Sequence, residues 1–307
     1  MTTRRVTTTF DPVGAVPRSV VGALAVIETK GYLRRVSIWI GLGLTPVAML
    51  THTSSDWSGG AYENTIPLGC MWLAIGTFVA GLRTGGRDSS SQLPDFFEDA
   101  PVDPGARTVA RLMGLVGPML LAVVVVAVVA IVSRVEGGFW IGDRPRRTGT
   151  ALHTPSELLQ PLLLVALFGA IGVALGRAVR APRVAIALVG GVVGFIVFGF
   201  WWVMNAPVLR AMALVQIQPL RIDLPPDIDP DRAPAKWLLD APADFHGVWT
   251  HRVVHVPTVA GHDLYLLGLV MLVCGWAVRG ARGRRVAIVG FAVTILGVMV
   301  QLAVRPE

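Results

Sequence analysis

Charged residues are scarce in this sequence of 307 residues: Asp, Glu, Lys and Arg make up 15% of it, whereas apolar residues make up 53%. A soluble domain carries nearer a quarter of charged residues. Several uncharged runs reach roughly 17 residues or more, which is long enough to cross the hydrocarbon core of a bilayer as a helix. The composition therefore excludes an ordinary soluble domain and predicts an integral membrane protein.

Cysteine and lysine are rare as well. The two cysteines, Cys70 and Cys274, both fall in predicted membrane spans, which favours buried apolar side chains over a disulfide or a metal site. Only Lys30 and Lys236 are lysine, and the excess of Arg, Ala, Val and Gly is typical of a GC-rich bacterial genome. No small-residue cleavage site ends the first apolar run, so a signal peptide is not expected.

The apolar runs predict an all-α polytopic membrane protein with about seven transmembrane helices, within a range of six to eight. The predicted spans are Val36–Leu50, Ile66–Leu82, Leu112–Val132, Leu158–Leu175, Val184–Met204, Leu264–Val278 and Val286–Leu302. They divide the chain into a cytoplasmic N-terminus with an elbow helix (1–35), five spans (36–204) with a cytoplasmic coupling segment (84–111), an extracytoplasmic loop (205–261) and the last two spans (262–307).

The segment "SVVGALAVIETKGYLRR" precedes the first span. Val20, Leu24 and Ile27 recur at helical spacing on one face, whereas Glu28 and Arg34 are polar. This pattern favours an amphipathic helix that lies in the membrane interface. The alternative is a helix that extends the first span into the cytoplasm.

Arginine near the span ends sets the expected orientation. The turns "GRAVRAPR" and "RGARGRR" carry positive charge and no acid, and with a cytoplasmic N-terminus they both lie inside. Arg144, Arg146 and Arg147 then lie outside, against the rule. The balance predicts a multi-pass protein of a bacterial plasma membrane, with its N-terminus inside and its C-terminus outside.

The predicted spans lack ionisable side chains in their interiors, whereas ion-coupled carriers, voltage sensors and intramembrane proteases need them at membrane depth. The sequence also lacks the G-x-x-x-x-G-K-[ST] motif of a phosphate-binding loop. We therefore expect no enzyme activity and no cofactor on this chain. If the protein transports a solute, the energy must come from another chain.

The connector "RDSSSQLPDFFEDAPVDPGARTVARLMG" between the second and third spans is unusually long. Its centre holds Asp95, Phe96, Phe97, Glu98 and Asp99, an aromatic pair among carboxylates that can anchor a partner protein. The alternative is a disordered linker whose phenylalanines enter the membrane interface. The residues alone favour neither interpretation.

The elbow, the two spans and the connector ending "APVDPGARTVARLMG" resemble the membrane subunit of ABC-2 type exporters, in particular actinobacterial ones. The residues of the connector that match are Pro101, Val102, Arg107, Thr108, Ala110 and Leu112. The stretch "GHDLYLLGLVMLVCGWAVRGARGRRVAIVGFAV" is similar to the closing pair of spans in that family, which usually has six spans in all. "GAIGVALGRAVRAPRVA" resembles the cytoplasmic hairpin between its fourth and fifth spans.

The resemblance implies a permease that forms a homodimer or a heterodimer with a second permease. It implies a separate ATPase subunit that binds ATP and Mg²⁺, and a coupling contact made by the segment around 92–103 with this ATPase. Rigid-body movement driven by the ATPase would then be transmitted to the spans. The resulting expectation is the permease subunit of an ATP-driven exporter, with lipid and protein partners and no nucleic acid. The alternatives are a membrane scaffold or sensor, and a channel or carrier that does not use ATP.

The outer loop 205–261 is too long for a simple connection and forms either a small cap or an excursion without a further role. His251 and His255 are four residues apart, which is a spacing that can bind a metal on a helix. The run "HRVVHVP" is equally consistent with a strand. Because no cysteine or well-placed carboxylate completes a site, we expect no metal there. His262 and Asp263 are expected at the start of the next helix.

Overall fold

The computed structural model describes residues 18–53, 67–89, 103–136, 139–140, 150–179, 190, 211–214, 221–224, 251–254 and 256–303. Most of these residues are helical. The helices are α1 (Arg18–Leu33), α2 (Val36–Thr53), α4 (Pro67–Gly85), η1 (Gly86–Ser89), α6 (Pro104–Met113), α7 (Val116–Val135), α8 (Pro155–Ala178), α11 (Val256–Val278) and α12 (Gly280–Ala303).

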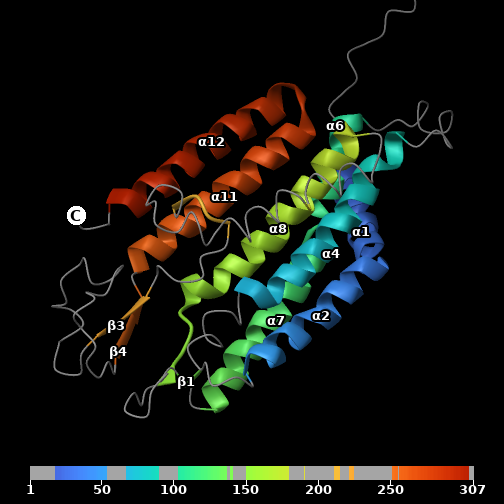
Figure 1. Cartoon of the computed structure of the whole chain (residues 1–307). Coiled ribbons are helices and arrows are strands. Elements are labelled where there is room, and N and C mark those ends of the chain that lie inside the picture. The colour runs from blue at the N-terminus through green and yellow to red at the C-terminus, as the bar shows by residue number, and fades with distance from the viewer. Residues whose placement is uncertain are drawn as a thin grey trace, which may run out of the picture.

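Two short antiparallel strand pairs accompany the helices. β1 (Phe139–Trp140) pairs with β2 (Thr150–Ala151), and β3 (Arg221–Leu224) pairs with β4 (His251–Val254). Both pairs lie near the end of the bundle where α8 and α11 begin (Figure 1). The described part of the chain is therefore a helical protein with two small strand pairs at one end.

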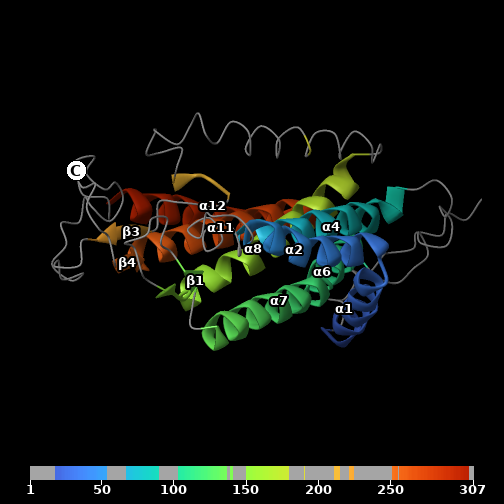
Figure 2. The same ribbon diagram turned by 60° about the horizontal axis from the view of Figure 1, so that its bottom comes forward.

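The long helices lie side by side in a bundle (Figure 1). α8 is central: it packs against α4, α7 and α11, and most of its residues are buried. α12 packs mainly against α11 at the edge and exposes a long apolar face that includes Ile288, Phe291 and Met299. Figure 2 shows α7 on one side of the layer that contains α11, α8, α4 and α2.

Four stretches within the described residues are long and apolar enough to cross a membrane: Pro104–Val135, Pro155–Ala178, Pro257–Val278 and Gly280–Ala303. A shorter apolar stretch, Val36–Val47, lies in α2. The chain is accordingly a helical membrane protein. Helices occur at six of the predicted spans, but the predicted span 184–204 lies outside the described residues except for Gly190, so the total of about seven stays a prediction.

Two of these stretches are longer than the apolar runs that predicted them. α11 begins at Val256, inside the segment 205–261 that the sequence assigned to the outer loop. α8 begins at Pro155 and includes Glu157, whose carboxylate accepts from the backbone N–H of Thr154 at 2.8 Å in a capping box. The expectation that spans lack ionisable groups therefore holds for the apolar runs but not for the whole helices.

Glycine sets the contact between α11 and α12. Each helix carries a glycine every seventh residue, and the glycines meet in antiparallel register: Gly261 with Gly297, Gly268 with Gly290, and Gly275 with Gly283. A Cβ on Gly297 would lie 2.7 Å from the carbonyl oxygen of Gly261, and one on Gly290 would lie 2.8 Å from that of Gly268. Only glycine permits this backbone approach, which gives helices in lipid their close packing.

Glycines also fix the directions of α2, α4 and α8. Gly41 contacts Trp72 whereas Gly76 contacts Ser37, so α2 and α4 are antiparallel. A Cβ on Gly81 would lie 2.7 Å from the carbonyl oxygen of Gly169, and Gly85 contacts Val173 four residues later in both helices. α4 and α8 therefore run in the same direction.

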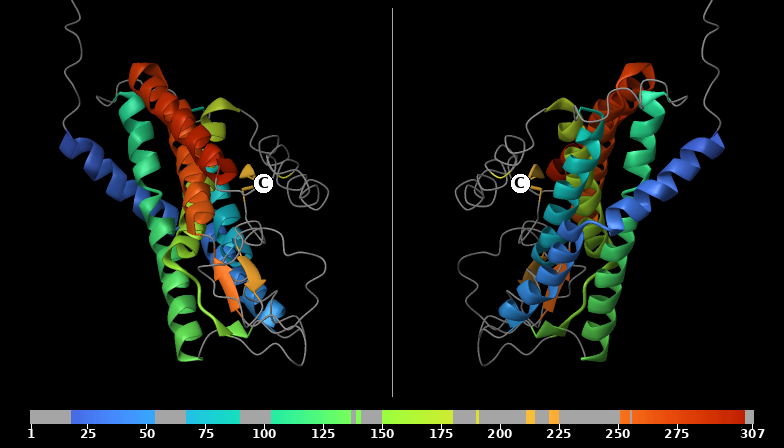
Figure 3. Two further views of the ribbon diagram at one scale, coloured as in Figure 1. Left: turned by 90° about the vertical axis from the view of Figure 1, so that its left-hand side faces the viewer. Right: turned by 90° about the vertical axis from the view of Figure 1, so that its right-hand side faces the viewer.

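α1 leaves the bundle obliquely rather than continuing α2 (Figure 3). It ends at Leu33, and α2 begins at Val36, where the chain changes direction. The alternative that the elbow simply extends the first span is thus wrong. Another break, at Gly114 and Leu115, separates α6 from α7 within the predicted third span.

Candidate functional site

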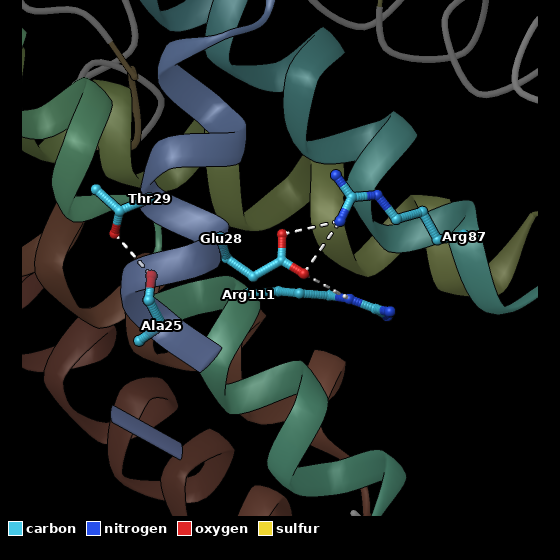
Figure 4. A network of polar contacts seen from close by, with 5 residues as sticks. All are labelled: Ala25, Glu28, Thr29, Arg87 and Arg111. Atoms are coloured by element: carbon cyan, nitrogen blue, oxygen red, sulfur yellow. Dashed lines mark hydrogen bonds and ion pairs between the residues drawn. The ribbon is translucent and has the colours of Figure 1, made fainter. Parts of the chain in front are cut away.

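Three elements meet around the carboxylate of Glu28 (Figure 4). Nη1 of Arg87, in η1, lies 3.1 Å from both carboxylate oxygens of Glu28, in α1. Nε of Arg111, in α6, lies 3.9 Å from Oε1. The side chain of Glu28 is 15% exposed, that of Arg87 42% and that of Arg111 6%, so the pair with Arg111 is the better shielded of the two. We call this arrangement the elbow junction.

The sequence of α6 positions Arg111. Asp103 caps the helix by accepting from the backbone N–H of Ala106 at 3.1 Å, and Pro104 occupies its first turn. Thr108 and Arg111 are three residues apart and both buried, so they share the face that packs toward α1. The cap thus sets the register that places the guanidinium next to Glu28.

Small residues after α6 allow α1 to come close. A Cβ on Gly114 would lie 2.9 Å from Cβ of Glu28, and a Cβ on Gly117 would lie 3.1 Å from Cγ2 of Thr29. Thr29 in turn donates its hydroxyl to the carbonyl of Ala25 at 2.8 Å. The break between α6 and α7 is therefore where the elbow rests on the bundle.

The junction combines burial with an excess of positive charge. Tyr32 is fully buried there. Its burial, and to a smaller extent the negative charge of Glu28, raise the pKa of its phenol above the ordinary range. Burial also lowers the pKa of Arg35, as do the neighbouring charges of Arg87 and Arg83. Glu28 is thus a carboxylate in a cluster of arginines, and it holds the cluster together.

The elbow junction joins α1 to both ends of the connector. Arg87 lies in η1, which ends at Ser89, and Arg111 lies in α6, which begins at Pro104. A single carboxylate therefore contacts the last helix before residues 90–102 and the first helix after them. Glu28 thus links α1 to the two helices that flank residues 90–102.

The connector residues predicted to bind a partner (Asp95, Phe96, Phe97, Glu98 and Asp99) lie outside the described residues. Their role as a docking element stays a prediction. The contacts of Glu28 with Arg87 and Arg111 could not be predicted from the sequence, because residues 59 and 83 positions apart leave no periodic signal. The one local signal was an arginine on the buried face of "RTVARLM".

The structure describes one of the two histidines considered for a metal site. His251 opens β4 and is paired with Leu224 of β3, which confirms the strand alternative for 251–254, while His255 lies outside the described residues. Among the residues that the structure describes, no group of three or more His, Cys, Asp or Glu side chains is placed to hold a metal.

His262 differs from its expected position at the start of a helix, because α11 begins two turns earlier and buries it completely. Beside it, Tyr265 donates its hydroxyl to the carbonyl of Met212 at 2.7 Å, and Nε2 of Gln301 donates to that of Ala211 at 3.0 Å. These polar side chains fasten the segment 211–214 to α11 and α12. Their packing explains why the helix continues through a polar stretch.

Comparisons with protein-family models, with curated proteins and with solved structures found no match to this chain. What is established is the class, a helical membrane protein with several candidate spans.

Proposed function

We propose that this chain is the transmembrane permease subunit of an ATP-driven ABC-2 type exporter, energised by a separate ATPase subunit. The proposal rests on the sequence resemblance described above together with one structural observation: Glu28 contacts both Arg87 and Arg111, so the elbow is joined to both flanks of the connector. A coupling segment needs such a connection if movement at the segment is to reach the spans.

In the proposed mechanism the ATPase binds the connector through Phe96 and Phe97 at the cytoplasmic side. Closure of the ATPase dimer displaces the connector, and η1 and α6 move with it. Glu28 couples this displacement to α1, and the break at Gly114 lets α6 tilt relative to α7. The substrate path lies between the permeases of a dimer, and ATP and Mg²⁺ bind to the partner chain.

The test is affinity purification of the full-length protein from its host in a mild detergent, followed by mass spectrometry. We expect a soluble ATPase of the ABC class to co-purify. Phe96→Ala with Phe97→Ala should abolish its capture, whereas Ser90→Ala with Ser91→Ala, in the same connector, should leave it unchanged.

Two results would overturn the proposal. Capture of a protein other than an ATPase, lost on changing Phe96 and Phe97, would identify a scaffold or sensor instead. Uphill solute transport by the purified chain alone, in vesicles with only an ion gradient, would identify a carrier that does not use ATP.

A further inference from the structure

A groove runs along the closed end of the α11–α12 hairpin, which lies at the edge of the bundle (Figure 1). Its volume is about 1010 Å³, at the upper end of the range for sites that hold drug-sized ligands. The α11 wall is formed by Leu272, Trp276 and Arg279, at helical spacing, and the α12 wall includes Arg284 and Ile288. The small residues Gly275, Gly280, Ala281 and Ala287 line the groove between these larger side chains, above the close contact of the two helices.

The groove is apolar along its length and basic at the turn. Trp276 is 54% exposed and Ile288 is 60% exposed, although both are large apolar side chains. Arg279 and Gly280 adopt left-handed backbone conformations, with φ of 57° and 70°, and Arg279, Arg284 and Arg285 all line the groove at or beside this turn. The lining is thus almost entirely apolar, and three exposed arginines lie at the end of the groove where the turn is.

The arginines of the groove have no acidic counterpart on these helices. Within the described stretch 256–303 the acid is Asp263, near the opposite end of α11. No ion pair joins Arg279, Arg284 or Arg285 to any other described residue. The charge complement of the groove is therefore an anion from outside these helices.

We propose that this groove binds an anionic phospholipid, with the headgroup phosphate on Arg279, Arg284 and Arg285 and an acyl chain along Trp276 and Ile288. Guanidinium groups bind phosphate oxygens through paired hydrogen bonds, and basic pockets between membrane helices bind anionic headgroups. A soluble anion would satisfy the arginines but leave the apolar walls exposed. The proposal does not depend on the function proposed above, since it requires only a membrane.

The experiment is native mass spectrometry of the full-length protein in detergent, titrated with phosphatidylglycerol or with zwitterionic phosphatidylcholine. We expect tighter binding of phosphatidylglycerol. Arg284→Gln with Arg285→Gln should weaken it by roughly 25-fold, which is about fivefold for each charge. Arg282→Gln is the matched control, because Arg282 lies two positions before Arg284 in α12 and is exposed but does not line the groove. It should leave binding of this lipid unchanged.

Ala281→Trp provides an independent variant that keeps every arginine and fills the groove, and it should weaken phosphatidylglycerol binding as well. If Arg282→Gln weakened the binding of phosphatidylglycerol as much as the double arginine variant, the binding would depend on diffuse surface charge and the proposal would be overturned. Equal binding of phosphatidylglycerol and phosphatidylcholine would overturn it as well. Displacement of the lipid by inorganic phosphate at equivalent concentrations would assign the arginines to a soluble anion. If the double arginine variant does not fold, unaltered lipid binding by Ala281→Trp alone is sufficient to reject the site.

Discussion

Glu28 is the residue on which the elbow junction depends, because it neutralises two arginines of unequal exposure. Changing Glu28 to Gln leaves the guanidinium of Arg111, which is 6% exposed, without its nearby carboxylate. We expect a loss of about 1–3 kcal/mol in the free energy of unfolding, because a charged contact at a shielded site contributes more than one at an exposed site. The measurement is the melting temperature of the purified protein in detergent.

The matched control is Arg87→Gln, which removes the ion pair with the more exposed arginine. Because exposed ion pairs contribute little to stability, we expect the free energy of unfolding to fall by about 0–1 kcal/mol. Equal destabilisation by Glu28→Gln and Arg87→Gln would contradict the expectation that the better-shielded pair with Arg111 contributes more to stability than the pair with Arg87.

His153 makes the stability of the chain depend on pH. Burial lowers the pKa of its imidazole to about 4, from an ordinary value of 6.5. Above pH 6.5 the side chain is neutral in the folded and the unfolded chain, and its contribution is complete. As the pH falls from 6.5 towards 4 the unfolded chain binds the proton first, so the folded state loses stability, by about 3 kcal/mol at most.

The measurement is the melting temperature between pH 7.5 and pH 4.5, compared with that of His153→Gln. The variant should be less sensitive to acid over this interval. The same acid sensitivity in both proteins would show that other groups are responsible.

At the scale of single residues, the apolar runs of the sequence could predict which side chains are buried. They could not predict contacts between residues that are far apart in the sequence. Cys70 is buried as expected, whereas Cys274, also predicted to be buried, is only partly buried. Glu28 lies near Arg87 and Arg111 because the chain returns to α1 after α2 and α4. No pattern of neighbouring residues in the sequence predicts this return. His262 was misplaced for a related reason, since the neighbours that bury it include the distant segment 211–214.

At the scale of elements, the antiparallel glycine register is what holds α12 to the bundle. A Cβ on Gly290 would lie 2.8 Å from the carbonyl oxygen of Gly268, which is backbone and cannot rotate away. Gly290→Ala should therefore separate α11 from α12 and destabilise the protein by about 1–3 kcal/mol. The readouts are the melting temperature and the rate of proteolysis in the α11–α12 turn.

Gly43→Ala is the control for this change, because nothing lies within 4 Å of a Cβ at Gly43, in α2. Alanine is the better helix former, so this variant should be neutral or more stable by up to about 1 kcal/mol. If both variants destabilise equally, the effect belongs to helical glycine in general and not to the close approach of α11 and α12.

Long apolar runs predicted the positions of most helices because lipid requires every backbone hydrogen bond to be satisfied within the helix. The helix ends were harder to predict. α11 extends beyond its apolar run because the buried polar residues on it have distant partners, such as Met212 for Tyr265. The contact between α11 and α12 does have a signal in the sequence, because glycines recur every seven residues at 261, 268 and 275 and again at 283, 290 and 297.

At the scale of the whole molecule, the helix directions are mutually consistent. α2 is antiparallel to α4, α4 is parallel to α8, and α11 is antiparallel to α12. Arg177 donates to the carbonyl of Ala277, so the C-terminal ends of α8 and α11 lie together and these helices are parallel. It follows that α2 and α12 run in the same direction, and that α2 begins at the end of the bundle opposite to Ala303.

The basic residues predicted to be cytoplasmic gather at the end where α2 begins. They lie in or beside α1, the end of α4, α6, the end of α8 and the α11–α12 turn. Those in the described residues are Arg18, Lys30, Arg34, Arg35, Arg83, Arg87, Arg107, Arg111, Arg177, Arg279, Arg282, Arg284 and Arg285. Segregation of arginine to one end of a bundle is what the positive-inside rule requires. The sequence-based orientation thus has a consistent three-dimensional counterpart, although its direction in the cell stays a prediction.

That direction can be tested with reporters that fold in one compartment only. Alkaline phosphatase needs disulfides and is active outside the cytoplasm, whereas green fluorescent protein reports the inside. We expect phosphatase activity from fusions after Glu136 and Glu307 and none from a fusion after Arg282, with fluorescence in the reverse pattern. Arg282 lies in the turn whose arginines resist translocation, and α12 carries the chain from there to the other end of the bundle. A fluorescent fusion after Glu307 together with an active phosphatase fusion after Arg282 would invert the orientation, and with it the side on which an ATPase could reach the connector.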